Sequence, residues 1–166
     1  MLADILNDYF DYLYPLVPIV HRPSFLQAFS NQRDLYDKDL LCLTYALCAV
    51  TVAALPSKFQ KYQRSEEPPR YANPKEMIYA CYDTTQHLRG RDYFDTINYQ
   101  KWAVSHLMYL SFFHVAEYNR SRMIEVEAMQ LARLLDLHKV SGYDGLNCIE
   151  KQLRKKAFWL TFHGHV

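Results

Sequence analysis

The chain has 166 residues and a mass of 19.7 kDa, half of its residues are hydrophobic, and only four are glycine. Disordered chains lack that much apolar surface, and collagen-like or turn-rich all-β chains need far more glycine. Nineteen basic and 18 acidic residues give a net charge of +1, whereas a module that wraps DNA by neutralising phosphates is normally much more basic.

Apolar residues at helical spacing predict a first amphipathic helix over residues 2–14. Pro15 and Pro18 end this helix, and residues 17–21 should be extended, because proline disfavours helix at the residue before it. Prolines therefore separate the first helix from everything that follows.

Ser24 and Gln27 form a capping-box pair, which predicts a short helix through residue 29. The next helix begins at residue 37 or 38 and runs to about 55, and it is apolar on nearly every face. A helix that is hydrophobic all round belongs at the centre of a bundle. Residues 57–72 are polar, charged and contain two prolines, so we expect an exposed loop.

Asn73-Pro74 followed by Glu76 is a second start signal, with proline at the first helical position. This helix should close near Gly90. Further helices are predicted over 93–118, over 121–137 and, after a turn at 141–145, from a cap formed by Asn147 and Glu150.

These elements predict an all-α fold, an irregular bundle of about six or seven helices in a single domain spanning residues 1–166. The last helix is still apolar on its core side at Val166, so we expect the N-terminal portion of a larger helical domain. The N-terminus lacks a basic region followed by an apolar stretch, and no apolar run reaches the ~20 residues of a bilayer span. The four scattered cysteines form no CxxC pair, which favours reduced thiols in an intracellular protein.

Two stretches share a pattern with one known family. Residues 5–26 read ILNDYFDYLYPLVPIVHRPSFL, an aromatic helix followed by a proline-punctuated run and His-Arg-Pro-Ser-Phe. The second stretch runs from Glu127 to Trp159; it opens with EAMQLARLLDLHK and closes within the segment EKQLRKKAFWLTF. In this order, the stretches resemble the middle homology (regulatory) region of fungal Zn(2)-Cys(6) binuclear-cluster transcription factors. Asp136 stands where that family usually has glycine, and Lys155 and Lys156 replace arginines.

The resemblance implies a non-catalytic regulatory domain that acts in the nucleus and controls transcription activation, for instance of carbon-source or other metabolic genes. It further implies a small-molecule inducer, intramolecular or intermolecular contacts and a homodimer as partners, and no membrane. Zinc would bind only in an N-terminal DNA-binding domain absent from this chain, and DNA would be contacted only through that domain, so no cofactor is expected here. The alternative is a helical protein-interaction scaffold outside transcription. A helical enzyme is disfavoured, because the chain has no nucleophile elbow and no glycine-rich phosphate loop.

The first motif places His21, Arg22, Pro23 and Phe25 together. They could form a polar latch or a ligand contact. The simpler interpretation is a turn that starts a helix, in which Arg22 bonds backbone carbonyls and Phe25 packs inward. We keep all four as candidate regulatory residues.

The second motif places Arg154, Lys155 and Lys156, together with Lys151, on the last predicted helix, and Trp159 follows. The cations could contact an activation segment or an acidic partner. They could equally form a solvated face, or Arg154 could reach inward and hold a neighbouring helix through a bidentate acid pair.

Fourteen tyrosines and nine phenylalanines make the chain rich in aromatic residues. Tyrosine combines an apolar ring with a polar hydroxyl, which suits a pocket for a small polar metabolite or a protein interface, although an aromatic core is the simpler interpretation. The candidate pocket-lining residues are Tyr99, Trp102, Tyr109 and Phe113.

Three pairs of side chains have a spacing that is found in metal sites. We expect no metal from them, because the His-x-x-Glu order is reversed relative to helical-bundle metal motifs, no second copy is present, and the pair of histidines lies at a chain end. The pairs are His114 with Glu117, Asp83 with His87, and His163 with His165.

Overall fold

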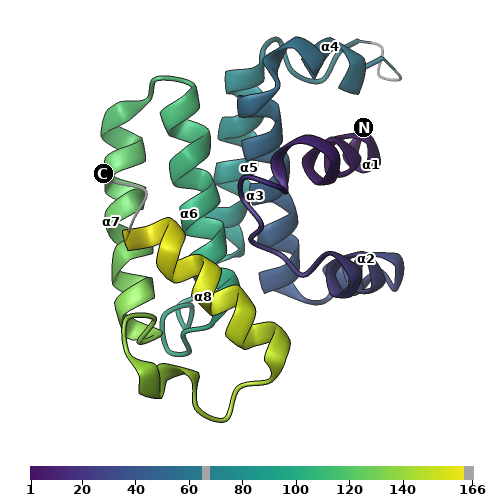
Figure 1. The fold of residues 1–166 in the computed structure, drawn as a ribbon. Coiled ribbons are helices and arrows are strands. Elements are labelled where there is room, and N and C mark those ends of the chain that lie inside the picture. Colours follow the sequence, from purple (N-terminus) through teal and green to yellow (C-terminus); the bar gives the residue numbers. More distant parts are fainter. Residues whose placement is uncertain (65–67, 163–166) are drawn as a thin grey trace.

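The computed structural model describes residues 1–64 and 68–162, and every regular element among them is a helix (Figure 1). The predicted all-α fold is confirmed, with eight α-helices in this part of the chain instead of six or seven. The α-helices are α1 (Leu2–Asp8), α2 (Arg22–Ser30), α3 (Lys38–Ala54), α4 (Phe59–Tyr62), α5 (Pro74–Leu88), α6 (Tyr99–His114), α7 (Tyr118–Leu134) and α8 (Cys148–Phe162). Four further helical turns lie among them in the described part of the chain, the π-helical η1 (Tyr9–Leu13) and the 3-10 turns η2 (Arg33–Leu35), η3 (Pro56–Lys58) and η4 (Val140–Tyr143).

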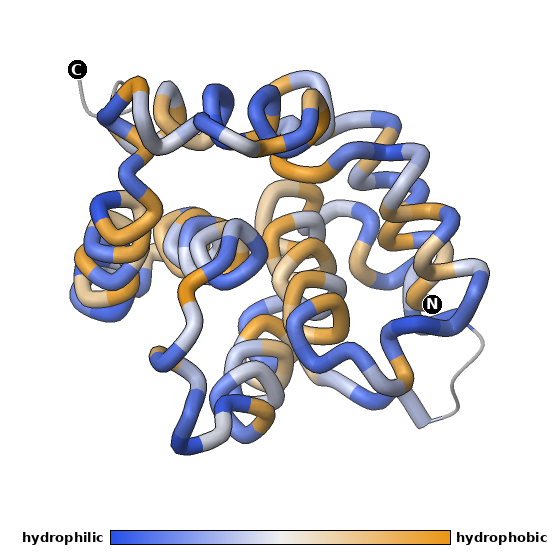
Figure 2. The backbone as a smooth tube through the Cα atoms, turned by 90° about the horizontal axis from the view of Figure 1, so that it is seen from below, coloured by the Kyte–Doolittle hydropathy of each residue, from blue (hydrophilic) through white to orange (hydrophobic). Residues whose placement is uncertain are grey.

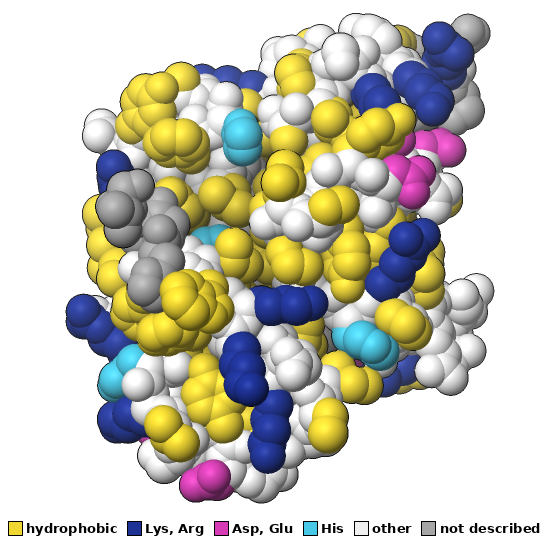
Figure 3. Space-filling model, in the orientation of Figure 1, with side chains coloured by type: hydrophobic (Ala, Val, Ile, Leu, Met, Phe, Trp, Pro, Cys, Tyr) yellow, Lys and Arg dark blue, Asp and Glu magenta, His cyan; other side chains and the backbone are white. Residues whose placement is uncertain are grey.

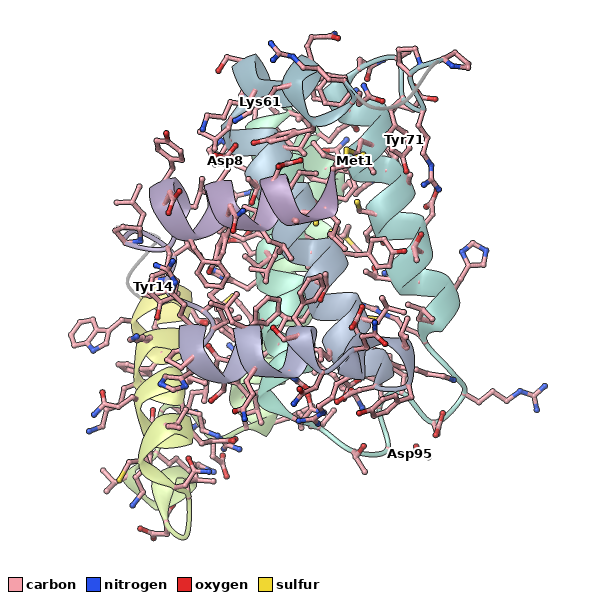
Figure 4. The ribbon with its side chains drawn as sticks, turned by 90° about the vertical axis from the view of Figure 1, so that its right-hand side faces the viewer. Met1, Asp8, Tyr14, Lys61, Tyr71 and Asp95 are labelled. Atoms are coloured by element: carbon pink, nitrogen blue, oxygen red, sulfur yellow. The ribbon has the colours of Figure 1, made fainter. Side chains whose placement is uncertain are left out.

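Helix α3 lies at the centre of the bundle, as its all-round apolar sequence predicts. It packs against α1, α5 and α6, while α6 packs against α7 on its far side. Helices α1 and α2 lie across α3 (Figure 4), and α8 runs obliquely over the lower part of the molecule. Seen from below, the tube is mostly hydrophobic in the middle and hydrophilic in many outer turns (Figure 2).

Side-chain caps fix several helix starts. Because a cap satisfies a backbone N–H that the helix leaves free, it stabilises the first turn by about 1 kcal/mol. Three of the predicted helix starts carry such a cap: Asp37 accepts from the N–H of Leu40, Asn73 from Glu76 and Asn147 from Glu150.

Two predicted helix starts are wrong. The helix expected from Ser24 begins at Arg22, because the Nδ1 atom of His21 accepts from the backbone N–H of Ser24 and acts as the cap. The helix expected from Tyr93 begins only at Tyr99, where the side chain of Asn98 accepts from the N–H of the third helical residue. At α2 the side chain of His21 takes the cap position expected for Ser24, and at α6 the cap by Asn98 outweighs the apolar pattern.

The segment over residues 57–72 is only partly the exposed loop that its polarity predicts. It contains α4, whose Phe59 and Tyr62 side chains are buried against the core. The hydroxyl of Tyr62 and the ammonium of Lys58 each donate to the carboxylate of Asp8 over 2.7 Å. Burial would raise the pKa of Asp8, but these hydrogen bonds and the positive charges of the neighbouring lysines outweigh it and lower the pKa.

Two helices end in the same backbone motif with a left-handed residue. After α6, Ala116 has φ +60° and the N–H of Glu117 bonds the carbonyl of Phe112; after α7, Asp136 has φ +53°. In each case the N–H groups of two successive residues satisfy carbonyls of the last turn, which is the Schellman arrangement. Glycine is usual at this position because it has no Cβ to clash. This preference explains why the family that the chain resembles usually has glycine where this chain has Asp136.

No single helix among the described residues is both long and apolar enough to cross a bilayer. Helix α3 and the segment 56–62 meet the length and composition criteria together, but they are bent by 98°. Whether residues 1–166 are part of a larger helical domain stays a prediction.

Candidate functional site

Two buried tyrosine hydroxyls hold the non-helical segment 17–21, the connector between η1 and α2, against the helices. Tyr9, in η1, donates to the carbonyl of Val17, and Tyr99, at the start of α6, donates to the carbonyl of Ile19, each over 2.7 Å. Burial raises the pKa of both phenols well above their usual value. Both therefore remain protonated donors throughout the neutral range, and helices far apart in sequence fix one short connector.

A pocket of about 190 Å³ lies beside this connector. Its floor is apolar and includes the buried core residues Leu40 and Leu43 of α3. The connector and α2 border it on one side and the first half of α8 on another. The lining residues are Ile19, Val20, His21, Ser24, Phe25, Ala28, Arg33, Asp37, Leu40, Leu43, Tyr99, Gln100, Ile149 and Leu153.

Polar groups stand along the edge of the pocket. The Nδ1 atom of His21 lies 2.7 Å from the hydroxyl of Ser24, and the guanidinium of Arg33 lies 3.2 Å from the carboxylate of Asp37. Gln100, which carries an amide side chain, also lines the cavity. An apolar floor with a few polar groups at its edge is the usual composition of a small-molecule site.

Of the four candidate residues of the first motif, two border this pocket and two lie outside its lining. His21 and Phe25 border it, and the ring of Phe25 packs between Phe10 and Phe29, with centroids 5.9 and 6.2 Å away. Phe25 thus packs inward as predicted. The guanidinium of Arg22 lies over the ring of Phe10 at 5.0 Å, in place of the expected bonds to backbone carbonyls. Pro23 is the second residue of α2.

Of the four aromatic residues expected to line a pocket, only Tyr99 borders this one. Trp102 is fully buried and its indole N–H donates to the hydroxyl of Thr161 in α8 over 3.1 Å. Tyr109 and Phe113 lie two and three turns further along α6, and Phe113 contacts the ring of Tyr118. Trp102 thus links α6 to α8, and Phe113 links α6 to α7. Their positions on α6 direct these rings away from the connector.

Arg154 of α8 reaches inward. Its guanidinium donates to the carboxylate of Glu150 over 3.0 and 3.1 Å, and to the backbone carbonyls of Leu135 and Gly142 over 3.2 and 3.4 Å. The acid lies on its own helix, so the expected link to a neighbouring element is made through carbonyls of the α7–α8 connection. Lys155 is exposed and Lys156 half-buried.

Other chemistry-bearing side chains have structural partners. The Nδ1 atom of His87 lies 2.6 Å from the backbone carbonyl of Asp83, and Glu117 pairs with Lys75. No three His, Cys, Asp or Glu side chains within residues 1–64 and 68–162 are arranged to hold a metal ion; His163 and His165 lie outside the described residues. Burial raises the pKa of Cys42 to about 11, so this thiol is not a ready nucleophile.

Sequence reasoning missed the polar edge of the pocket and its α8 wall. Arg33 and Asp37 are opposite charges four residues apart, which is a signal for a local ion pair, although the structure forms it between η2 and the cap of α3. Nothing local pointed to Gln100 or Ile149, because their place depends on how α6 and α8 pack.

Comparison with protein-family models matches residues 6–163 to the family described as "Fungal specific transcription factor domain". The match includes both stretches that border the pocket, the connector with α2 and the first half of α8. Neither the curated proteins nor the solved structures contain a match.

Proposed function

This chain belongs to the fungal specific transcription factor domain family, and on that premise we propose that its pocket receives a small-molecule inducer that sets transcriptional output. Family membership supports a role in regulating transcription, and the family is a regulatory one, not a catalytic one. We further propose that the domain acts in the nucleus and controls carbon-source or other metabolic genes. Zinc and DNA would be bound by a separate zinc-cluster domain.

One observation carries the proposal: the pocket is built jointly by the two motif stretches. His21 and Phe25 come from the first stretch, and Leu153 comes from the second, more than a hundred residues later. A ligand held between them contacts α2 and α8 at once. It therefore favours the arrangement of helices that closes on it, which is the requirement for a ligand to shift a conformational equilibrium.

The lining indicates the class of inducer. A volume of about 190 Å³ is below the roughly 300–1,000 Å³ of sites for drug-sized ligands. The apolar floor suits an apolar body, and His21, Ser24 and Gln100 can bond a polar end. We therefore expect a compact amphipathic metabolite and not a highly charged one.

The test is a thermal-shift screen with a panel of sugars, amino acids, nucleobases and short aliphatic and aromatic acids. A ligand present at about 100 times its Kd stabilises the folded chain by about 2.7 kcal/mol, which raises Tm by roughly 5–10 °C. Ala28, which lines the pocket from α2, is replaced by phenylalanine to fill the cavity. The matched control is Gln27→Phe, since Gln27 is an exposed residue of the same helix.

We expect at least one amphipathic compound to raise Tm of the unaltered chain and of Gln27→Phe, and to leave Ala28→Phe unchanged. A compound that stabilises Ala28→Phe equally would place binding elsewhere. A panel without any stabilising compound would contradict an inducer of this class.

A further inference from the structure

The outward face of α8 carries a strip of basic side chains that ends in a tryptophan. Lys151, Lys155 and Trp159 follow one another at intervals of four residues, and Lys156 lies beside them. Residues spaced by four share one face of a helix. We name these four residues the α8 strip. A row of Lys and Arg side chains is visible over α8 in the space-filling view (Figure 3).

Lys151, Lys155 and Trp159 face away from the pocket, whereas Lys156 lies at the edge of the strip nearest to it, seven residues after the lining residue Ile149. Lys155 follows Leu153, which lines the pocket, by two residues, and two residues turn a helix by about 200°. Ala157, four residues after Leu153, is fully buried, whereas the side chain of Trp159 is 59% exposed. Helix α8 therefore has an inner face committed to the core and an outer face that solvent reaches.

Positive charge on the strip is not compensated within the described part of the chain. No carboxylate there lies within ion-pair distance of Lys151, Lys155 or Lys156. Glu150, the single acidic residue of α8, is occupied by the guanidinium of Arg154. Lysines of like charge four residues apart on a helix also repel one another slightly, so an anionic partner relieves an unfavourable arrangement.

We propose that the α8 strip is a docking surface for an acidic peptide segment that also carries apolar side chains. Carboxylates of the peptide pair with the three lysine ammonium groups, and an apolar side chain packs on the ring of Trp159. Tryptophan is enriched among the residues that dominate binding energy at interfaces, because its large ring buries much area with few rotatable bonds. Charge complementarity orients the peptide and speeds its association.

The composition of the strip favours an acidic peptide over nucleic acid. Arginine recognises phosphate best through its planar fork, and Arg154 uses its fork on Glu150 and on two backbone carbonyls. Three lysines neutralise few phosphates, and the net charge of the whole chain is only +1.

The two tryptophans of the chain make the surface measurable directly. Trp102 is fully buried and Trp159 is exposed, so a ligand that covers the strip changes mainly the emission of Trp159. The titrants are a short synthetic peptide that alternates Asp or Glu with Leu, the same peptide with Asn and Gln in place of the acids, and a single-stranded oligonucleotide. All are free of tryptophan.

We expect the acidic peptide to shift the emission to shorter wavelength and to bind more weakly as salt is added. The double variant Lys155→Glu, Lys156→Glu should weaken binding at least about tenfold, which corresponds to 1.4 kcal/mol. The matched control is Lys61→Glu, Arg64→Glu, which changes the charge equally at the opposite end of the molecule (Figures 1 and 4). Far-UV circular dichroism checks that both variants are folded.

The proposal is overturned if the acidic peptide does not bind, or if the neutral peptide binds as tightly. It is equally overturned if the α8 variant and the control variant behave alike. Tighter binding of the oligonucleotide than of the acidic peptide would reassign the strip to nucleic acid. None of these outcomes depends on a ligand in the pocket, so this test stands apart from that of the inducer.

Discussion

Removing the hydroxyl of Tyr99 tests how the connector beside the pocket is held. Tyr99→Phe keeps the ring, which packs at 5.4 Å from Trp102, and deletes only the donor to the carbonyl of Ile19. No other donor to this carbonyl is found among the described residues. Leaving a buried acceptor without a partner costs about 1–3 kcal/mol, so we expect a loss of about 2 kcal/mol in the free energy of unfolding.

Tyr9→Phe supplies the internal comparison. The carbonyl of Val17 loses the Tyr9 hydroxyl but keeps the N–H of Ile19 at 2.9 Å. Because its acceptor remains satisfied, this variant should lose only about 1 kcal/mol or less. We therefore expect Tyr99→Phe to lose more free energy of unfolding than Tyr9→Phe.

Urea denaturation followed by far-UV circular dichroism measures both variants, and a loss of about 2 kcal/mol should lower Tm by roughly 4–8 °C in a chain of this size. A cost below about 0.5 kcal/mol for Tyr99→Phe would refute the reasoning, since the magnitude rests on an orphaned carbonyl. A larger cost for Tyr9→Phe would refute it as well.

Three further predictions concern stability and can be measured by denaturant titration. The pKa of Asp8 is lower in the folded chain than the value of about 4 in the unfolded chain, so its carboxylate stabilises the fold fully above pH 4, and this stabilisation is lost as the pH falls through the folded pKa. The stability advantage of the unaltered chain over Asp8→Asn should therefore shrink as the pH falls below about 5. An advantage that does not change with pH contradicts this prediction. Ala116→Gly should stabilise the chain by about 0.5–1 kcal/mol, because residue 116 has φ +60° at the end of α6, and a loss of stability would argue against the strained cap. Gly142→Ala should destabilise the chain by about 1–3 kcal/mol, since its Cβ would lie 2.4 Å from the backbone oxygen of Asp136. An unchanged denaturation midpoint would show that the backbone moves apart at no cost.

Local signals predicted much of the fold. Asp37, Asn73 and Asn147 each cap the helix that their sequence context announces, because a cap depends on residues within one turn. The all-round apolar pattern of residues 38–54 correctly placed α3 in the centre. His21 was missed as a cap, since histidine is not among the usual capping residues, although Pro23 at the second helical position marks the same start.

The pocket was less predictable, because it depends on tertiary packing. His21, Phe25 and Tyr99 were all singled out from the sequence, but nothing in their spacing indicated that they would lie around one cavity. Trp102 was expected to line a pocket, but it packs against α8 instead. The sequence of a helix does not reveal whether an aromatic ring on it faces a cavity or a neighbouring helix. The inward turn of Arg154 was one of the open interpretations, and the carbonyls that it bonds lie on a connection with no regular pattern.

Regulation of transcription through the pocket can be measured with a reporter gene in a fungal cell. The chain is placed between a heterologous DNA-binding module and an activation segment, and reporter output is compared across growth media for the unaltered chain, Ala28→Phe and Gln27→Phe. We expect reporter output to change with the medium for the unaltered chain and for Gln27→Phe, and to stay constant for Ala28→Phe, whose pocket is filled. A response of Ala28→Phe equal to that of the unaltered chain, or no response from any of the three, would contradict it.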